Sequence, residues 1–256
     1  MHTIDELIAI RVEELELTLK QLLQRNKLGT LAEMIDRTRN ALVIERWAKE
    51  QGIEAEAAAL QQLITQFRKA HGLFTAAQAK EWLEHRNMQL EDLAACLHPQ
   101  VLRQALTDSV VSEGEVRHYF QEHMLDFERA EISRIVTGDY GQCQELLFRV
   151  EEGADFHAMA RQYSLDTATA KSGGYAGIVT RDMLEPEEAA ALFAADSGTV
   201  LGPFERRREF ILLLVEKLYP AELDEETAEH IRQILFQHKL EAYQSTLTIS
   251  EDIWNL

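Results

Sequence analysis

The sequence has little cysteine, proline or glycine, and each shortage excludes a class of protein. Its 256 residues include 2 cysteines, 4 prolines and 12 glycines. Cys96 and Cys143 lie in different segments without CxxC spacing, which excludes a disulfide-rich scaffold. We expect buried free thiols, with a single structural bridge as the alternative. So few prolines and glycines also exclude collagen-like and low-complexity chains.

Long apolar runs are missing as well. No run of about 18 apolar residues occurs, so we expect no membrane-spanning helix. The segment from Met1 to Lys20 carries carboxylates among its apolar side chains and has neither a cationic start nor a small-residue cleavage site. It therefore predicts an amphipathic helix instead of a signal peptide, and a cytoplasmic protein.

Cationic residues are in the minority. The chain has 26 Lys and Arg against 44 Asp and Glu, a net charge of -18 at pH 7. Such a surface repels phosphate backbones, so we expect no nucleic-acid partner, whereas a basic or polar polypeptide would suit it. Hydrophobic residues make up 46% of the chain, enough for a packed core, and the length allows two domains.

Helical patterns occupy the first half of the chain. The spacing of apolar residues predicts helices over residues 4–24, 30–51, 55–70, 75–85, 90–97, 101–109 and 112–124. Gly52 is placed to end the second of these, and Thr75 with Gln78 forms a capping box. Pro99 predicts a restart or a kink.

The pattern changes near residue 129. Short strands are predicted over 130–136, 176–180 and 209–218, and helices over 140–151, 155–163, 186–195 and 224–243. Turns are predicted at 171–174 and 202–203, and a final strand or extended tail at 247–254. The alternation of strands and helices is typical of a small antiparallel α+β domain.

Several motifs in this half match one family in order and spacing. They are Gly153-Ala154-Asp155-Phe156 with Met159-Ala160 and Tyr163-Ser164, then AKSGGYAG at 170–177, AALF at 190–193 and SGTVLGP at 197–203. On these residues, the stretch from Ala130 to Tyr219 resembles the parvulin (PpiC-type rotamase) domain. The first half is similar to the helical chaperone region of SurA-type and PrsA-type foldases.

The resemblance implies an α+β protein in three parts. These are a SurA-like helical domain over 1–128, a parvulin-type domain with a small antiparallel sheet flanked by helices over 129–220, and a C-terminal helix and tail over 221–256 that return to the helical domain. It implies a peptidyl-prolyl isomerase that acts on Xaa-Pro bonds of a polypeptide client and needs no cofactor. Nothing in the sequence indicates an oligomeric state.

The chemistry of such an enzyme needs few groups. Rotation about an amide bond meets a barrier of about 20 kcal/mol, because the twisted state loses its resonance. An apolar pocket for the proline ring and well-placed hydrogen-bond donors favour that twisted state without a nucleophile or a metal. The nine histidines show no metal-binding spacing.

The family's site residues, carried over position by position, are mostly replaced. Asp166 stands at the Cys/Asp position and Arg134 at the first-strand histidine, and both are the expected catalytic residues. The last-strand histidine falls at Ile211, or at Phe210 with a shift of one residue. The expected substrate-binding residues are Met183, Leu184, Phe193, Tyr175 and Leu201.

The proline pocket departs most from the family. Its Phe falls at Glu188, whose carboxylate we expect to point outward and leave a shallower pocket, since burying a charge is costly. Leu184 takes the place of the pocket Met, with Met183 as the alternative. The run Arg206–Arg208 predicts a solvated loop.

Other interpretations stay open. Asp166 is also placed to cap a turn, Arg134 to be a surface cation, and Met183 and Leu184 to be core residues. The function is accordingly an isomerase of the parvulin type, or a catalytically degenerate parvulin-fold chaperone or peptide-binding accessory in peptide maturation or secretion. The chaperone and the accessory need only a groove that binds a polypeptide backbone.

Overall fold

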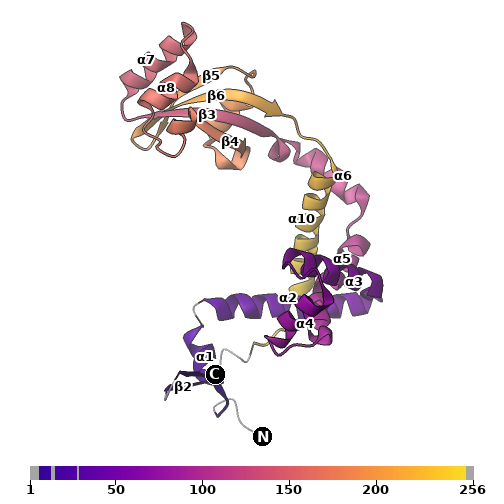
Figure 1. Ribbon diagram of the computed structural model, residues 1–256. Helices are drawn as coiled ribbons and strands as arrows, with labels where there is room; N and C mark the ends of the chain where they lie inside the picture. Colours follow the sequence, from indigo (N-terminus) through magenta and orange to yellow (C-terminus); the bar gives the residue numbers. More distant parts are fainter. Residues whose placement is uncertain (1–5, 13–14, 28, 252–256) are drawn as a thin grey trace. The chain divides into compact units, whose positions relative to one another are not determined.

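The structure, a computed structural model, describes residues 6–12, 15–27 and 29–251 and divides into two compact units (Figure 1). Unit 1 comprises Met1–Glu113 with Arg232–Leu256, and unit 2 comprises Gly114–Ile231. The sequence predicts domain boundaries after residues 128 and 220, and the two units divide the chain at other positions. The three-part division stays a prediction.

The N-terminal segment is a hairpin followed by a short helix, so the expected helix over 4–24 is wrong for the described residues before Leu19 and is found only over 19–24. β1 (Ile8–Val12) pairs antiparallel with β2 (Leu15–Thr18), and α1 (Leu19–Arg25) follows. Ile10-Arg11-Val12 and Leu15-Glu16-Leu17 alternate with the period of two that favours strands. A reciprocal capping box between Thr18 and Gln21 then starts α1.

The remaining helices of unit 1 confirm the sequence pattern. They are α2 (Thr30–Gln51), α3 (Ala57–Ala70), α4 (Ala76–Glu84), α5 (Leu90–Val110) and, from Arg232 onward, α10 (Glu225–Gln244). Gly52 ends α2 with a left-handed φ of 68°, and the box of Thr75 and Gln78 caps α4. α5 continues through Pro99, so no restart occurs there.

The C-terminal helix returns to the helical half, as expected. The ring of Phe236 on α10 is fully buried and stacks on Trp47 of α2 with 6.0 Å between centroids. The guanidinium of Arg103 on α5 lies 4.7 Å from the same ring. Phe236 therefore joins three helices of unit 1. Beyond α10, residues 247–251 form no strand, and 252–254 of the predicted tail lie outside the described residues.

Unit 2 contains a four-stranded antiparallel sheet in the order β4-β3-β6-β5. The strands are β3 (Arg129–Thr137), β4 (Tyr175–Thr180), β5 (Val200–Arg206) and β6 (Glu209–Tyr219). β5 was not predicted, because Gly202-Pro203 suggested a turn. The pair instead lies inside β5 at a register shift, where a Cβ on Gly202 would come within 2.5 Å of the Ile211 carbonyl oxygen.

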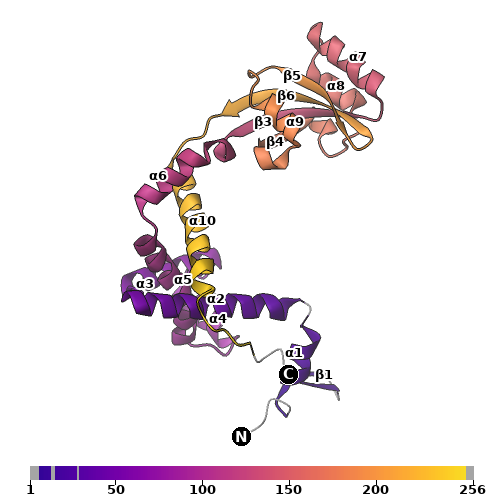
Figure 2. The same cartoon turned by 180° about the vertical axis from the view of Figure 1, so that it is seen from behind.

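Helices cover both faces of this sheet. On one face, α7 (Tyr140–Glu151) and α8 (Phe156–Tyr163) pack on a core that includes Ile135 and Leu212. On the other face, α9 (Pro186–Leu192) packs through Leu192 on a core that includes Ile132 and Leu213 (Figure 2). α6 (Glu113–Glu122), η1 (Met124–Phe127), η2 (Ala170–Ser172) and η3 (Arg181–Met183) complete the elements.

Two further expectations have an outcome in the structure. Both cysteines are free, but only Cys143 is buried, because Cys96 faces outward from α5. Burial raises the pKa of the Cys143 thiol. Within the described ranges, none of the helices has the length and apolar character of a membrane span.

The packing of Phe236 generates a stability prediction. Phe236→Ala should lower the free energy of unfolding of unit 1 by about 3–5 kcal/mol, because it opens a cavity between three helices. The matched control is Phe74→Ala in the same unit, whose side chain is 74% exposed and should change stability by less than about 0.5 kcal/mol. Urea denaturation followed by circular dichroism measures both. Equal effects of the two substitutions would contradict this packing.

Candidate functional site

A cavity of about 240 Å³ lies in unit 2 between the sheet, α9 and the loop that leads into β4. Its walls are mainly apolar, with three charged side chains among them. It is lined by Ile132, Arg134, Thr169, Ala176, Val179, Met183, Leu184, Glu188, Arg206, Ile211 and Leu213. The volume is at the small end for a ligand pocket, so it would take one side chain instead of a whole ligand of drug size.

Arg134 lines the cavity and is paired with Asp166, which lies behind it and not in the lining. Nε–H of Arg134 donates to Oδ2 of Asp166 at 2.8 Å, and Nη2 lies 2.7 Å from the same oxygen as an ion-pair contact. The hydroxyl of Thr169 donates to the same oxygen at 2.6 Å, and Oδ1 accepts the Ala168 N–H at 3.2 Å. Asp166 thus pairs with the guanidinium and also caps its own turn, as one sequence interpretation expected, while its catalytic role stays a prediction.

The electrostatics of Asp166 favour its anion. Partial burial alone would raise its pKa, but the hydrogen bonds from Thr169 and Arg134, together with the positive charge of Arg134, outweigh burial and lower the pKa below its ordinary value. The carboxylate is therefore ionised at neutral pH, and the ion pair with Arg134 is complete.

The loop around Asp166 is fixed to β3 by backbone contacts. The Leu165 N–H donates to the Val136 carbonyl at 2.8 Å, and the Arg134 N–H donates to the Gly174 carbonyl at 2.8 Å. Gly174 has a φ of 85°, and a Cβ there would stand 2.4 Å from the Arg134 carbonyl oxygen. Glycine is thus required at this position, which is the physical basis of the Gly-Gly turn in the sequence.

Glu188 points inward, so the expectation that it faces solvent is wrong. Its side chain is 3% exposed, and Oε2 accepts hydrogen bonds from Arg206 at 2.7 Å and from the Glu185 N–H at 3.1 Å. The guanidinium compensates the buried charge, and the carboxylate caps α9. Arg206 is accordingly part of the cavity, not of a solvated loop, whereas Arg207 and Arg208 are exposed.

The structure brings some of the predicted substrate-binding residues together and leaves others outside. Leu184 and the 62% exposed Met183 line the cavity. Phe193 and Leu201 pack against the adjoining core, and the Phe193 ring lies 4.4 Å from the guanidinium of Arg181. Tyr175 is exposed and hydrogen-bonds Glu131 instead. The site-residue assignments therefore stay predictions.

Sequence reasoning missed two polar residues of the site. Thr169 stands three residues after Asp166, a spacing that suits a side chain closing an Asx-type turn, so this signal was available. Arg206 was hidden in a basic run, since nothing local distinguishes it from Arg207 and Arg208. Its partner Glu188 is 18 residues away in the sequence.

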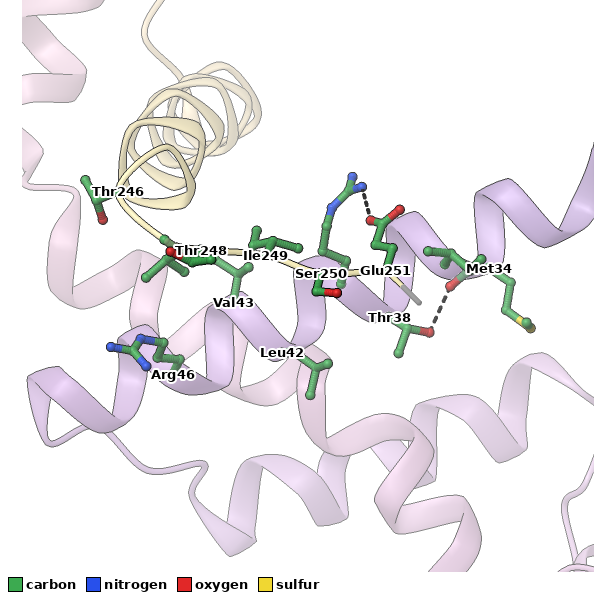
Figure 3. A pocket seen from close by; sticks show the side chains of 13 residues that line it. Met34, Thr38, Leu42, Val43, Arg46, Thr246, Thr248, Ile249, Ser250 and Glu251 are labelled. Atoms are coloured by element: carbon green, nitrogen blue, oxygen red, sulfur yellow. Dashed lines mark hydrogen bonds and ion pairs between the residues drawn. The ribbon is translucent and has the colours of Figure 1, made fainter. Parts of the chain in front are cut away.

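A second cavity, of about 840 Å³, lies in unit 1 (Figure 3). It is a groove between α2 and the extended segment 246–251, which is held by an ion pair of 2.8 Å between Arg39 and Glu251. Met34 and Leu42 of α2 are exposed along it. Across the described residues, no group of three or more His, Cys, Asp and Glu is placed to hold a metal ion.

Comparison with known proteins agrees with the motifs. Residues 140–217 match the family model of the rotamase, or PPIC-type PPIase, domain. This range begins after β3, so Arg134 lies outside it. The chain therefore contains a PpiC-type rotamase domain, and the resemblance is confirmed.

The relatives cover more of the chain. Foldase protein PrsA of Caldanaerobacter subterraneus subsp. tengcongensis is 28% identical over 126 residues, 49% of this chain and 41% of that protein. Foldase protein PrsA of Halalkalibacterium halodurans is 25% identical over 203 residues, 78% of this chain and 57% of that protein. The chain spans about half the length of these curated relatives.

Solved structures show similarity as well. A PpiC-type peptidyl-prolyl cis-trans isomerase domain is 25% identical and covers 39% of this chain and 99% of its own, with a TM-score of 0.37. PrsA from Bacillus cereus is 15% identical and covers 97% of both chains, with a TM-score of 0.46.

The lowered pKa of Asp166 generates a pH prediction. Asp166→Asn should lower the free energy of unfolding by about 1–3 kcal/mol at pH 7, because it weakens charged hydrogen bonds. A carboxyl group whose pKa is lower in the folded than in the unfolded protein stabilises the fold fully at pH values above its unfolded-state pKa of about 3.9. This stabilisation is lost as the pH falls through the folded-state pKa. The difference between wild type and variant should therefore shrink below about pH 4. Urea titrations from pH 7 to pH 2.5 measure it, and a constant difference would contradict the ion pair.

The pair of Glu188 and Arg206 generates a second prediction. Arg206→Leu should lower the free energy of unfolding by about 2–3 kcal/mol, because it leaves a buried carboxylate without a counter-charge. Adding Glu188→Gln should restore part of that loss, since the amide keeps the cap on α9. The exposed Arg208→Leu is the control and should be nearly neutral. Strictly additive effects in this double-mutant cycle would show that the two side chains do not interact.

Proposed function

We propose that the rotamase domain accelerates cis/trans exchange at Xaa-Pro bonds of a polypeptide client, with Arg134 as the hydrogen-bond donor. The observation that carries the proposal is the guanidinium of Arg134, held by Asp166 at the wall of a small cavity that has both apolar and charged walls. The cavity lies in the domain that matches the rotamase family. The names of the curated relatives, foldase proteins, support a polypeptide as the client.

Arg134 offers a donor that suits the twisted amide. Nε–H donates to Asp166 and Nη2 contacts the same carboxylate, whereas Nη1 has no acceptor among the described residues. The nitrogen of a planar prolyl amide shares its lone pair with the carbonyl group, and the lone pair becomes localised when the bond twists. A donor aimed at that nitrogen therefore stabilises the transition state more than the ground state, which is the condition for catalysis.

The apolar part of the cavity lining offers a pocket for the proline ring, which is the second requirement for catalysis. Ile132, Val179 and Leu184 line the cavity together with Ile211 and Leu213. A proline ring seated among them excludes water from the amide, and the loss of solvent strengthens the hydrogen bond from Arg134. No group in this arrangement has to form a covalent bond.

A second candidate function is a chaperone whose rotamase domain no longer catalyses. The buried Glu188–Arg206 pair favours it, because a charged floor suits a proline ring less well than an apolar one. The groove of unit 1 favours it too, since Met34 and Leu42 offer apolar surface along a length of helix (Figure 3). A peptide-holding accessory in maturation or secretion would use the same features.

Exchange spectroscopy separates the two functions. Nuclear magnetic resonance of Xaa-Pro peptides reads cis/trans exchange directly, without a coupling protease. We expect catalysed exchange with the wild type, a loss of about tenfold or more with Arg134→Lys, and a similar loss with Leu184→Asp. Arg134→Lys keeps the charge but not the planar fork, so it tests the geometry. Peptide binding without any acceleration would overturn the isomerase and favour the chaperone.

A further inference from the structure

β4 is an open edge of the sheet. In the part of the chain that the structure describes, it pairs with β3 alone, whereas β3 and β6 each pair on both sides. Edge strands commonly carry charged residues or proline that discourage pairing with another chain. The other edge strand, β5, has Pro203, Glu205 and Arg206, but β4, with the sequence YAGIVT, has none of these. β4 is therefore the less protected of the two edges.

The two faces of β4 differ in chemistry. Ala176 and Val179 line the cavity. Tyr175 and Ile178 are 44% and 51% exposed, and the register shift at Gly177 lets them share the opposite face. A strand laid along this edge would thus have one set of side chains at the cavity and the alternate set at Tyr175 and Ile178.

The Tyr175 face has the features of a cation subsite. The Tyr175 hydroxyl donates to Oε1 of Glu131 at 2.5 Å, which orients its exposed ring, and the Tyr219 hydroxyl donates to Oε2 at 3.1 Å. These hydrogen bonds lower the pKa of Glu131, so its carboxylate stays ionised. Aromatic faces attract Lys and Arg, and a carboxylate beside the ring adds to that attraction. Lys217 faces Glu131 across β3 and β6 and lies over the ring of Tyr219, 4.5 Å from its centroid, so Tyr175 is the ring that a client cation would use.

The charge of the domain points to the same partner. Unit 2 has 24 Asp and Glu against 11 Lys and Arg, so it carries -13 of the net charge of -18. A basic polypeptide segment is therefore attracted to this unit more than to unit 1.

We propose that the open edge of β4 takes up an extended, basic client segment as a fifth strand, with a proline ring in the cavity and a neighbouring Lys or Arg on Tyr175 and Glu131. This rests on the proposed function, because it names the substrate class of the same cavity. Adjacent residues of a strand point to opposite faces, so the cation immediately precedes or follows the proline. Proline has no N–H, and it therefore stands where the client backbone points away from β4.

Peptide binding tests the cation subsite. Three extended peptides that differ only in Lys-Pro, Gln-Pro or Glu-Pro are titrated into isotope-labelled protein and followed by amide shifts. We expect Lys-Pro to bind about three- to tenfold more tightly than Glu-Pro, with the largest shifts in β4. Tyr175→Leu should reduce this preference, since Glu131 and the charge of the domain remain, whereas Tyr140→Leu, a similarly exposed tyrosine on α7, should leave it unchanged. Equal affinities for the three peptides with the wild type would overturn the subsite.

Backbone substitution tests the added strand. Replacing single amides of the Lys-Pro peptide by esters removes one N–H at a time, and pairing with β4 predicts that only every second replacement weakens binding. Indifference to all the esters would overturn the strand.

Exchange spectroscopy of the same peptides keeps the two proposals apart. Acceleration without a charge preference would overturn the subsite and leave the isomerase standing. A charge preference without acceleration would support the subsite and overturn the isomerase.

Discussion

The guanidinium of Arg134 meets the carboxylate of Asp166 where the central strand β3 faces the loop that follows α8. One oxygen of Asp166 accepts a hydrogen bond from Nε of Arg134 and another from Thr169, and Nη2 of Arg134 lies 2.7 Å from it. Around this point the chain turns through Gly173 and Gly174 into β4, with the Gly174 carbonyl bound to the backbone of Arg134. The ion pair therefore holds Arg134 at the cavity, and the backbone bond between Arg134 and Gly174 fixes the place where β4 starts.

A second ion pair makes part of the cavity lining charged. Glu188 and Arg206 join α9 to β5, and the buried carboxylate of Glu188 depends on the guanidinium of Arg206 as its counter-charge. The site thus combines apolar walls with two ion pairs, where an isomerase needs only a ring pocket and a donor. This combination is compatible with slow catalysis and strong dependence on the residues beside proline, because much of the binding surface is polar.

Local signals made much of the fold predictable. The ends of α2 and α4 follow from Gly52 and from the box of Thr75 with Gln78, which act within a few residues. β5 and the Glu188–Arg206 pair were missed, because strand pairing and charge compensation join residues far apart in sequence. From sequence alone, a glutamate is expected to face solvent unless a counter-ion for it can be identified. The expectation for Glu188 was wrong because Arg206 could not be identified as its counter-ion. In the N-terminal segment, the helical and the strand period were both present, and pairing between β1 and β2 decided between them.

The central claim is that Arg134, held by Asp166, faces the prolyl bond of a bound client. Nitrogen-15 resonances of its guanidinium report this directly, and Arg134→Lys identifies them. On addition of a peptide with Lys-Pro, we expect the Nη1 signal of Arg134 to shift and its hydrogens to exchange more slowly with water, whereas a matched Lys-Ala peptide should leave both unchanged. An unchanged Arg134 signal at peptide concentrations that saturate β4 would contradict the claim and place the client elsewhere on the domain.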